Sequence, residues 1–257
     1  MNRVVWEKEG RLAHLTINNP PVNALNSEVL KDLGNCVDEI AQDDEITVVI
    51  LTGEGDKAYV AGADISEFPQ LNRENGEKMS RNGQSILHKL YELPAVVISA
   101  IHGFALGGGM ELALASDIRI AADNAKMGLP EVTLGIYPGF GGSQRLPRLI
   151  PEGKAKELIF TGSMISGEEA CRLGIVDHVV PAGEEKEKAK EIAHKILKNG
   201  PLGIKKAKKV INEGLNMTLD EGLKLEASYF GEICDSEDQK EGAQAFLEKR
   251  KAEFKGR

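Results

Sequence analysis

The stretch SAIHGFALGGGMELALASD, residues 99–117, carries the strongest structural signal in the chain. It runs from a β-branched apolar segment through a turn and the triplet Gly107-Gly108-Gly109 into an apolar segment of helical character. Glycine lets a backbone approach a ligand closely and adopt conformations that a Cβ forbids. A helix start presents unpaired N–H groups and a partial positive charge. The stretch therefore predicts a strand, a turn and a helix whose first amides suit an oxyanion.

Glu111 follows this triplet by two residues. The predicted helix would hold the Glu111 carboxylate at the mouth of the oxyanion site. A helix that merely crosses close to a strand, with Glu111 complementing the helix dipole, explains the same pattern equally well.

A second stretch, AGADI at 61–65, is rich in small residues. Such residues can place backbone N–H groups near a ligand, and Asp64 then follows as a turn or helix cap. A plain turn at the end of a strand is the alternative interpretation.

A third stretch places Glu131 after Pro130 in an apolar setting, between Leu129 and the pair Val132 and Leu134. Apolar neighbours disfavour the charged form of a carboxyl group, which raises its pKa toward use as a general acid. An exposed glutamate in the first turn of a helix that starts at Pro130 is the alternative.

The periodicity around these stretches predicts an α/β fold. Short β-branched runs predict strands at 12–17, 48–52, 95–101, 118–122 and 176–180, with helical patterns between them. After Pro181 every segment has helical character. We therefore expect an α/β body over residues 1–200 and a helical region over 201–257.

Two further segments outside the predicted strands carry expectations of their own. The polar stretch 66–80 predicts a mobile loop. The last helices carry an apolar stripe that must be covered, which predicts a homo-oligomer; the stripe consists of Leu219, Leu223, Ala227, Phe230 and Ile233.

Composition excludes several classes of protein. The 257 residues contain 32 Lys and Arg against 40 Asp and Glu, a net charge of −8, which disfavours a nucleic-acid binder or a membrane-surface protein. The five histidines and three cysteines lack metal-ligand spacing, so no metal site is expected. Neither glycine-rich stretch matches a nucleotide-binding motif, and Ser143 lacks the second glycine of a nucleophile elbow. A cytoplasmic location is expected, because the charged start MNRVVWEKEG does not suit a signal peptide.

Three motifs together resemble the enoyl-CoA hydratase (crotonase) family. They are AGADI at 61–65, AIHGFALGGGMELALASD at 100–117 and LPEVTLGIYPGFGGSQRLPRLI at 129–150, and the resemblance extends from NNPPVNALN at 18–26 to EDQKEGAQAFLEKRKAEF at 237–254. The resemblance implies a spiral of β-β-α turns, with C-terminal helices that pack subunits into trimers and dimers of trimers. It also implies a coenzyme A thioester substrate, and no cofactor beyond the coenzyme A of that substrate.

The same resemblance assigns roles to individual residues. It implies that the backbone N–H groups of Ala63 and Gly108 form the oxyanion hole, and that Glu111 and Glu131 are the catalytic acid–base pair. Substrate contacts are expected at Ala61, Asp64, Ile65 and Gly139. Ser66 stands where some hydratases carry a lysine near the adenine. The basic tail around Arg250 could contact phosphates across a subunit boundary, or could form a solvated helix face.

The pair of carboxylates favours hydration of a 2-trans-enoyl-CoA to a 3-hydroxyacyl-CoA, as in fatty-acid β-oxidation. Two alternatives stay open. One is an enoyl-CoA isomerase that uses the same site, and the other is a non-catalytic acyl-CoA-binding or RNA-binding member of the fold. The acidic net charge and the intact glutamate pair count against the second alternative.

Overall fold

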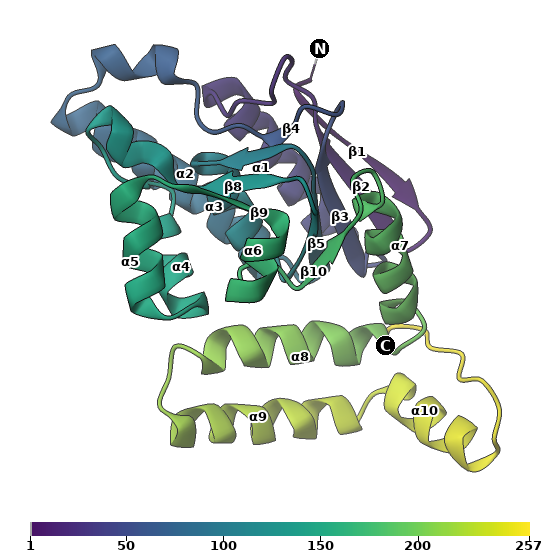
Figure 1. Ribbon diagram of the computed structural model, residues 1–257. Helices are drawn as coiled ribbons and strands as arrows, with labels where there is room; N and C mark the ends of the chain where they lie inside the picture. The colour runs from purple at the N-terminus through teal and green to yellow at the C-terminus, as the bar shows by residue number, and fades with distance from the viewer. Residues whose placement is uncertain (1) are drawn as a thin grey trace.

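A six-stranded sheet forms the first layer of the molecule, in a computed structural model that describes residues 2–257 apart from the side chain of Glu67 (Figure 1). Its strand order is β1-β2-β3-β5-β7-β10. Only β1 runs antiparallel to its neighbour, and the other pairs are parallel. The strands are β1 (Val4–Glu9), β2 (Leu12–Ile17), β3 (Val48–Gly53), β5 (Val96–Ile101), β7 (Ile118–Ala122) and β10 (His178–Val180).

A second, four-stranded sheet has the order β4-β6-β8-β9. Its strands are β4 (Ala58–Val60), β6 (Phe104–Leu106), β8 (Lys126–Gly128) and β9 (Met164–Ser166). Along the chain, a strand of the first sheet is followed by one of the second in the pairs β3–β4, β5–β6 and β7–β8, and helical segments follow each pair. This repeat is the expected β-β-α spiral, so the predicted fold class is confirmed.

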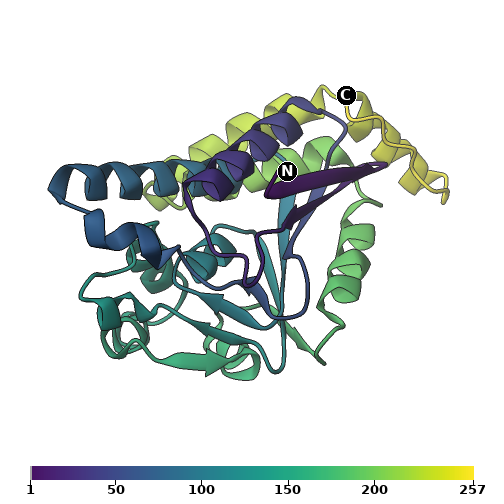
Figure 2. The same cartoon turned by 90° about the horizontal axis from the view of Figure 1, so that it is seen from above.

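Helices surround the two sheets and continue to the C-terminus. They are α1 (Ser27–Gln42), η1 (Ile65–Gln70), α2 (Arg73–Glu92), α3 (Gly108–Leu114), η2 (Pro130–Leu134), α4 (Gly142–Leu149), α5 (Glu152–Thr161), α6 (Gly167–Leu173), α7 (Glu185–Ile196), α8 (Pro201–Gly214), α9 (Leu219–Cys234) and α10 (Glu237–Leu247). Helices α1 and α2 contact each other and lie side by side in Figure 2.

The central strands β3, β5 and β7 of the six-stranded sheet are buried on both faces, whereas the edge strand β1 is largely exposed. All six residues of β3 are buried, and alternate residues face opposite ways. Val48 and Ile50 join a small cluster with Ala189 and Ala193 of α7, whereas Val49 belongs to the main core between the layers. A parallel strand covered on both faces reads as a continuous apolar run, which is why the sequence revealed it.

The sequence predicted five of the six strands of the first sheet and missed β1 (Val4–Glu9). The predicted strands at 12–17 and 118–122 match the structure, 48–52 and 95–101 differ by one residue, and 176–180 shortens to 178–180. The four strands of the second sheet were missed. They have three residues each, too few for a periodicity to emerge.

The prediction of a loop at 66–80 was wrong. Residues 65–70 form the 3-10 helix η1, and α2 begins at Arg73. Asn72 caps α2, because its side chain accepts hydrogen bonds from the backbone N–H groups of Glu74 and Asn75 while the side chain of Asn75 accepts one from the Asn72 backbone N–H. This is a capping box built from two asparagines, and the first turns look polar because they face solvent.

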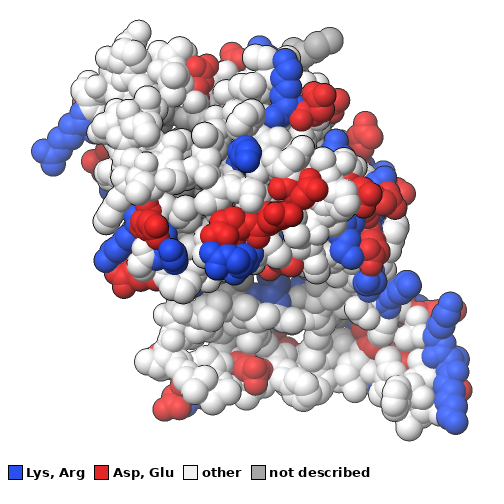
Figure 3. All heavy atoms as spheres, viewed as in Figure 1, with Lys and Arg blue, Asp and Glu red and all other residues white. Residues whose placement is uncertain are grey.

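The last helices form a separate layer beneath the sheets (Figure 1). Buried Lys208 on α8 fixes this layer, since its Nζ donates to the Ala95 carbonyl at 2.9 Å and to the Asp117 carboxylate at 2.7 Å. Helix α9 lies on the outer side of α8 and none of its residues is buried. In Figure 3 much of the surface over these two helices is uncharged.

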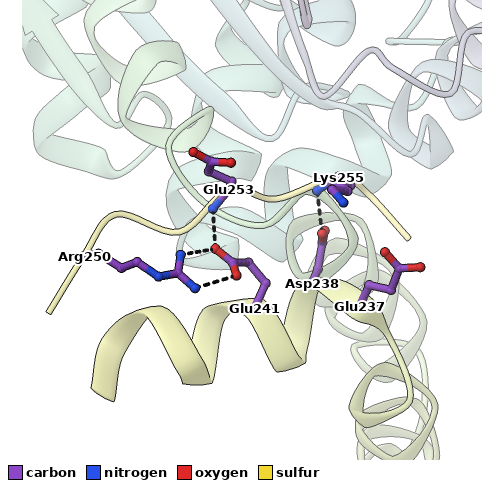
Figure 4. A pocket seen from close by; sticks show the side chains of 6 residues that line it. All are labelled: Glu237, Asp238, Glu241, Arg250, Glu253 and Lys255. Carbon is purple, nitrogen blue, oxygen red and sulfur yellow. Dashed lines mark hydrogen bonds and ion pairs between the residues drawn. The ribbon is translucent and has the colours of Figure 1, made fainter. Parts of the chain in front are cut away.

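The chain after α10 folds back across that helix as an extended segment (Figure 4). Arg250 makes a two-pronged ion pair with Glu241, at 2.6 and 2.9 Å. Buried Asp238 accepts hydrogen bonds from the backbone N–H groups of Lys255 and Gly256. The basic tail is therefore not the helix face that the sequence suggested, and the Arg250 guanidinium is already paired within the chain.

Candidate active site

The glycine triplet lies where α3 meets the second sheet. Gly107 has φ +49°, a conformation that favours glycine, and its N–H donates to the Gly128 carbonyl at 2.9 Å. A Cβ on Gly109 would lie 2.0 Å from the Val60 carbonyl oxygen, so α3 can approach β4 only with glycine there. The close crossing considered as an alternative is therefore real, and it brings the start of α3 against the end of β4.

Two backbone amides meet at this crossing. Gly108 is the first residue of α3, where an N–H has no acceptor within the helix. A Cβ on Gly108 would lie 3.6 Å from the Ala63 nitrogen. Leu25 bonds to the Gly62 carbonyl and the Asp64 N–H in a parallel bridge, which turns the N–H of Ala63 away from Leu25. The structure thus brings together the two predicted oxyanion-hole residues, Ala63 and Gly108.

Glu111 lies in the first turn of α3 and is only 2% exposed. Its Oε1 accepts hydrogen bonds from the backbone N–H groups of Phe140 at 2.8 Å and Gly142 at 2.7 Å. Burial raises the pKa of Glu111 to about 7, and the charge of Glu131 adds to this rise, whereas the two amides oppose it. The carboxylate is held on one oxygen and has a pKa suited to proton transfer near neutrality.

Glu131 stands on η2, immediately after Pro130, and packs over the glycine turn. Its Oε1 lies 2.8 Å from the place a Cβ on Gly107 would occupy. Its Oε2 is buried with no hydrogen-bond partner among the described residues. Burial raises the pKa of Glu131 to about 7. The sequence predicted Leu134 among the apolar neighbours that surround Glu131, but the Leu134 side chain is 53% exposed.

The loop that holds Glu111 is anchored on its other side to α2. The Gly139 carbonyl accepts hydrogen bonds from Ser80 Oγ at 2.6 Å and from Gln84 Nε2 at 2.9 Å. The Phe140 ring occupies the space above Gly83, where a Cβ would lie 2.4 Å from the ring. The sequence interpretation missed these contacts, because it placed Ser80 in a loop.

A cation lies close to the same loop. The Arg145 guanidinium on α4 stacks 5.0 Å from the centre of the Tyr91 ring, and its buried Nε has no hydrogen-bond partner among the described residues. The charge of Glu111 acts on Arg145 and partly offsets the lowering of its pKa by burial. This electrostatic contact was also missed from the sequence.

The remaining predicted substrate contacts lie near the oxyanion pair. The Ala61 N–H donates to the Val22 carbonyl, and Ile65 is 59% exposed. Asp64 caps η1 by accepting a hydrogen bond from the Ser66 N–H at 3.0 Å. Contacts of these residues with substrate stay predictions.

Within residues 2–257 there is no group of three or more His, Cys, Asp or Glu side chains placed to hold a metal ion. No helix in that range is long and apolar enough to cross a membrane.

The geometry defines a class of enzyme site. Two adjacent amides can stabilise negative charge on a carbonyl oxygen, and two carboxyl groups that titrate near neutrality can move protons beside it. Such a site suits acid–base chemistry through an enolate.

The chain belongs to the enoyl-CoA hydratase/isomerase family, whose model matches residues 7–257. It is 50% identical to the short-chain-enoyl-CoA hydratase of Clostridium acetobutylicum, across 100% of this chain and 99% of that protein. It is 45% identical to the crotonyl-CoA hydratase of Syntrophomonas wolfei, across 98% and 97% of the two chains. The crystal structure of an enoyl-CoA hydratase from Bacillus anthracis superposes with a TM-score of 0.95 at 42% identity, covering 99% of this chain and 100% of that one.

Proposed function

We propose that the protein adds water reversibly and in syn fashion to a 2-trans-enoyl-CoA, giving a 3-hydroxyacyl-CoA. The observation that carries this proposal is the pair Glu111 and Glu131, both with a pKa of about 7, beside the amides of Ala63 and Gly108. The names of the full-length relatives support the same reaction.

Carbonyl activation falls to the backbone. The N–H groups of Ala63 and Gly108 donate to the thioester carbonyl oxygen, which gains charge as the enolate forms. One such donor contributes about 3–4 kcal/mol of transition-state stabilisation. This stabilisation is the part of the reaction that side-chain substitutions leave in place.

Proton transfer falls to the two carboxyl groups. Glu111, fixed through Oε1, uses Oε2 to orient a water molecule and takes its proton as the oxygen bonds to C3. The C2–C3 π electrons move to form the enolate, and protonated Glu131 then gives its proton to C2. Exchange with solvent restores both groups. Each contributes roughly 10²–10⁴-fold.

We propose that this reaction needs no cofactor, because it moves only a proton and a hydroxide equivalent and transfers no electrons. Exhaustive treatment with a chelator should leave turnover unchanged. A cytoplasmic location also belongs to the proposal, and cell fractionation followed by immunodetection tests it.

A short acyl chain is the proposed substrate, because the relatives at 50% and 45% identity are named for short-chain and crotonyl substrates. The test is a panel of 2-trans-enoyl-CoAs from four carbons upward, followed by ultraviolet loss of the conjugated thioester. The highest kcat/KM is expected at four carbons, and no loss of absorbance with any member would refute hydration.

Enoyl-CoA isomerisation is the second candidate, because the same carboxylates flank an enolate and the family includes isomerases. Product analysis separates the two reactions, since only hydration adds the mass of water. A non-catalytic acyl-CoA-binding or RNA-binding role is the third, and the substrate panel tests that as well.

We further propose that the chain forms a homo-oligomer, a trimer or a dimer of trimers. Helix α9 exposes Leu219 at 77%, Leu223 at 51% and Phe230 at 68%, and burial of such side chains stabilises subunit contacts. Sedimentation should show a species several times the 27.8 kDa chain mass. A stable, active monomer would contradict the proposal.

A further inference from the structure

We propose that Ser80 and Gln84 on α2 are positioning residues that act on Glu111 through one peptide group, the one joining Gly139 to Phe140. This inference rests on the proposed role of Glu111 as the base. It assigns a part in the reaction to a helix that contributes no group to the chemistry itself.

Both ends of this peptide group are engaged. Its carbonyl, that of Gly139, accepts hydrogen bonds from Ser80 Oγ at 2.6 Å and from Gln84 Nε2 at 2.9 Å. Its N–H, that of Phe140, donates to Glu111 Oε1 at 2.8 Å. The two bonds from α2 to the carbonyl are therefore linked in series, through one amide, to the bond on the carboxylate.

Hydrogen bonds in series polarise one another, by about 10–30% per bond. Two donors on the carbonyl make the N–H of the same amide a stronger donor, and a stronger donor favours the ionised carboxyl group. The bonds also fix the plane of the peptide, and with it the direction of the N–H. Ser80 and Gln84 thus stabilise the ionised, correctly oriented form of Glu111.

Packing leaves the loop little freedom to replace these bonds. Gly83 is buried between the two donors, and a Cβ there would lie 2.4–2.6 Å from atoms of the Phe140 ring. Gln84 Nε2 also donates to Ser80 Oγ at 3.0 Å, which aligns the two side chains on the same carbonyl. Helix and loop are therefore joined by both packing and hydrogen bonds.

Charged side chains on other elements also interact electrostatically with Glu111. Glu131 on η2 raises its pKa, and Arg145 on α4 carries the opposing charge. Arg145 itself is also faced by Tyr91 and Glu92 at the far end of α2. None of these groups is altered by a substitution at Ser80 or Gln84, so a changed pH profile in such variants reports on the peptide group.

The test compares Ser80→Ala and Gln84→Leu with Ser85→Ala and Asn82→Leu. The last two sit on the exposed surface of the same helix and serve as matched controls. We expect each of the first two to lower kcat about threefold to tenfold, the effect of one neutral hydrogen bond, with KM unchanged. The acidic limb of the kcat–pH profile should move up by about half a unit, because Glu111 must be ionised to accept a proton.

Ser80→Thr keeps a hydroxyl on the carbonyl and should restore both kcat and the acidic limb. A fall in kcat with an unmoved limb, or no fall at all in correctly folded protein, would overturn the proposal. Thermal unfolding of each variant separates misfolding from mispositioning, and Gln84→Leu, at an exposed position, decides the case if Ser80→Ala unfolds.

A Glu111→Gln variant, measured alongside, separates this inference from the mechanism on which it rests. If that variant keeps full activity, the proposed base is wrong. If it is inactive while Ser80→Ala and Gln84→Leu behave as the controls do, only the positioning role is wrong.

Discussion

Glu111 and Glu131 reach the same pKa in different surroundings. Both are raised to about 7 by burial, yet Glu111 has two amide donors on one oxygen and Glu131 has a buried oxygen without a partner. A held carboxylate keeps its direction while it takes a proton from water. A carboxyl group with an unpaired oxygen is free to present a proton to carbon. The proposed roles of base and acid therefore rest on this difference in hydrogen bonding and not on pKa.

The largest effect is expected for Glu111→Gln. The amide oxygen can still accept from Phe140 and Gly142, so the fold and acyl-CoA binding should persist. Loss of the base should lower turnover about 10²- to 10⁴-fold, measured as hydration of crotonyl-CoA. Near-normal turnover would remove Glu111 from the mechanism and end the distinction between the two carboxylates.

Glu131→Gln should lose hydration by about 10²-fold and, with it, exchange of the α-proton in heavy water. In the unaltered protein, hydration in heavy water should place deuterium at the α-carbon of the product. Mass spectrometry and NMR measure both. A variant that hydrates normally but no longer shifts a 3-enoyl double bond would show that the site is an isomerase.

Each of the two carboxylates packs against a different glycine, so each can be displaced separately by a substitution. A Cβ on Gly107 would lie 2.8 Å from Glu131 Oε1, and a Cβ on Gly142 would lie 3.0 Å from Glu111 Cγ. Alanine at either position should displace one carboxylate and cost about tenfold to a hundredfold in kcat. Gly153→Ala, in open space on α5, is the control. Equal activity of all three variants would contradict the geometry.

The smallest effect concerns stability. A carboxyl group whose pKa is raised on folding contributes stability that is fully present below its unfolded pKa and is lost as pH rises through its folded pKa. For Glu131 this window runs from 4.5 to about 7. Glu131→Gln should therefore gain about 1–2 kcal/mol in unfolding free energy over the unaltered protein at pH 8, and little at pH 4.

Urea unfolding at fixed protein concentration measures this, with exposed Glu7→Gln as the control. A gain of the same size at both pH values would mean that the ionisation of Glu131 does not oppose folding.

The sequence reached the site through local signals. The triplet pointed to the amides at a helix start and to Glu111, and Pro130 with its apolar neighbours pointed to Glu131. The family resemblance then singled out the Gly108 amide. That Ala63 and Gly108 are adjacent follows from β4 packing against α3, a contact between distant segments that only the family resemblance could imply.

The short strands of the second sheet and the start of α2 gave no local sequence signal that predicted them. Three-residue strands show no period, and the asparagine capping box at Asn72 was taken for a loop. Ser80 was lost with the first turns of that helix, whereas Gln84 lies beyond the predicted loop and no pattern marked it as a donor.

The proposed site combines backbone amides with side-chain carboxylates, and mutation affects these two kinds of group differently. In the proposed mechanism the carbonyl is activated by backbone amides, and a Cβ on Gly109 would clash with the Val60 carbonyl, so the fold does not accommodate a side chain there. The carboxylates are side chains, each replaceable by a single substitution without moving the amides. A mutation of one carboxylate can therefore change which reaction the enolate undergoes, while the amides proposed to stabilise that enolate stay in place.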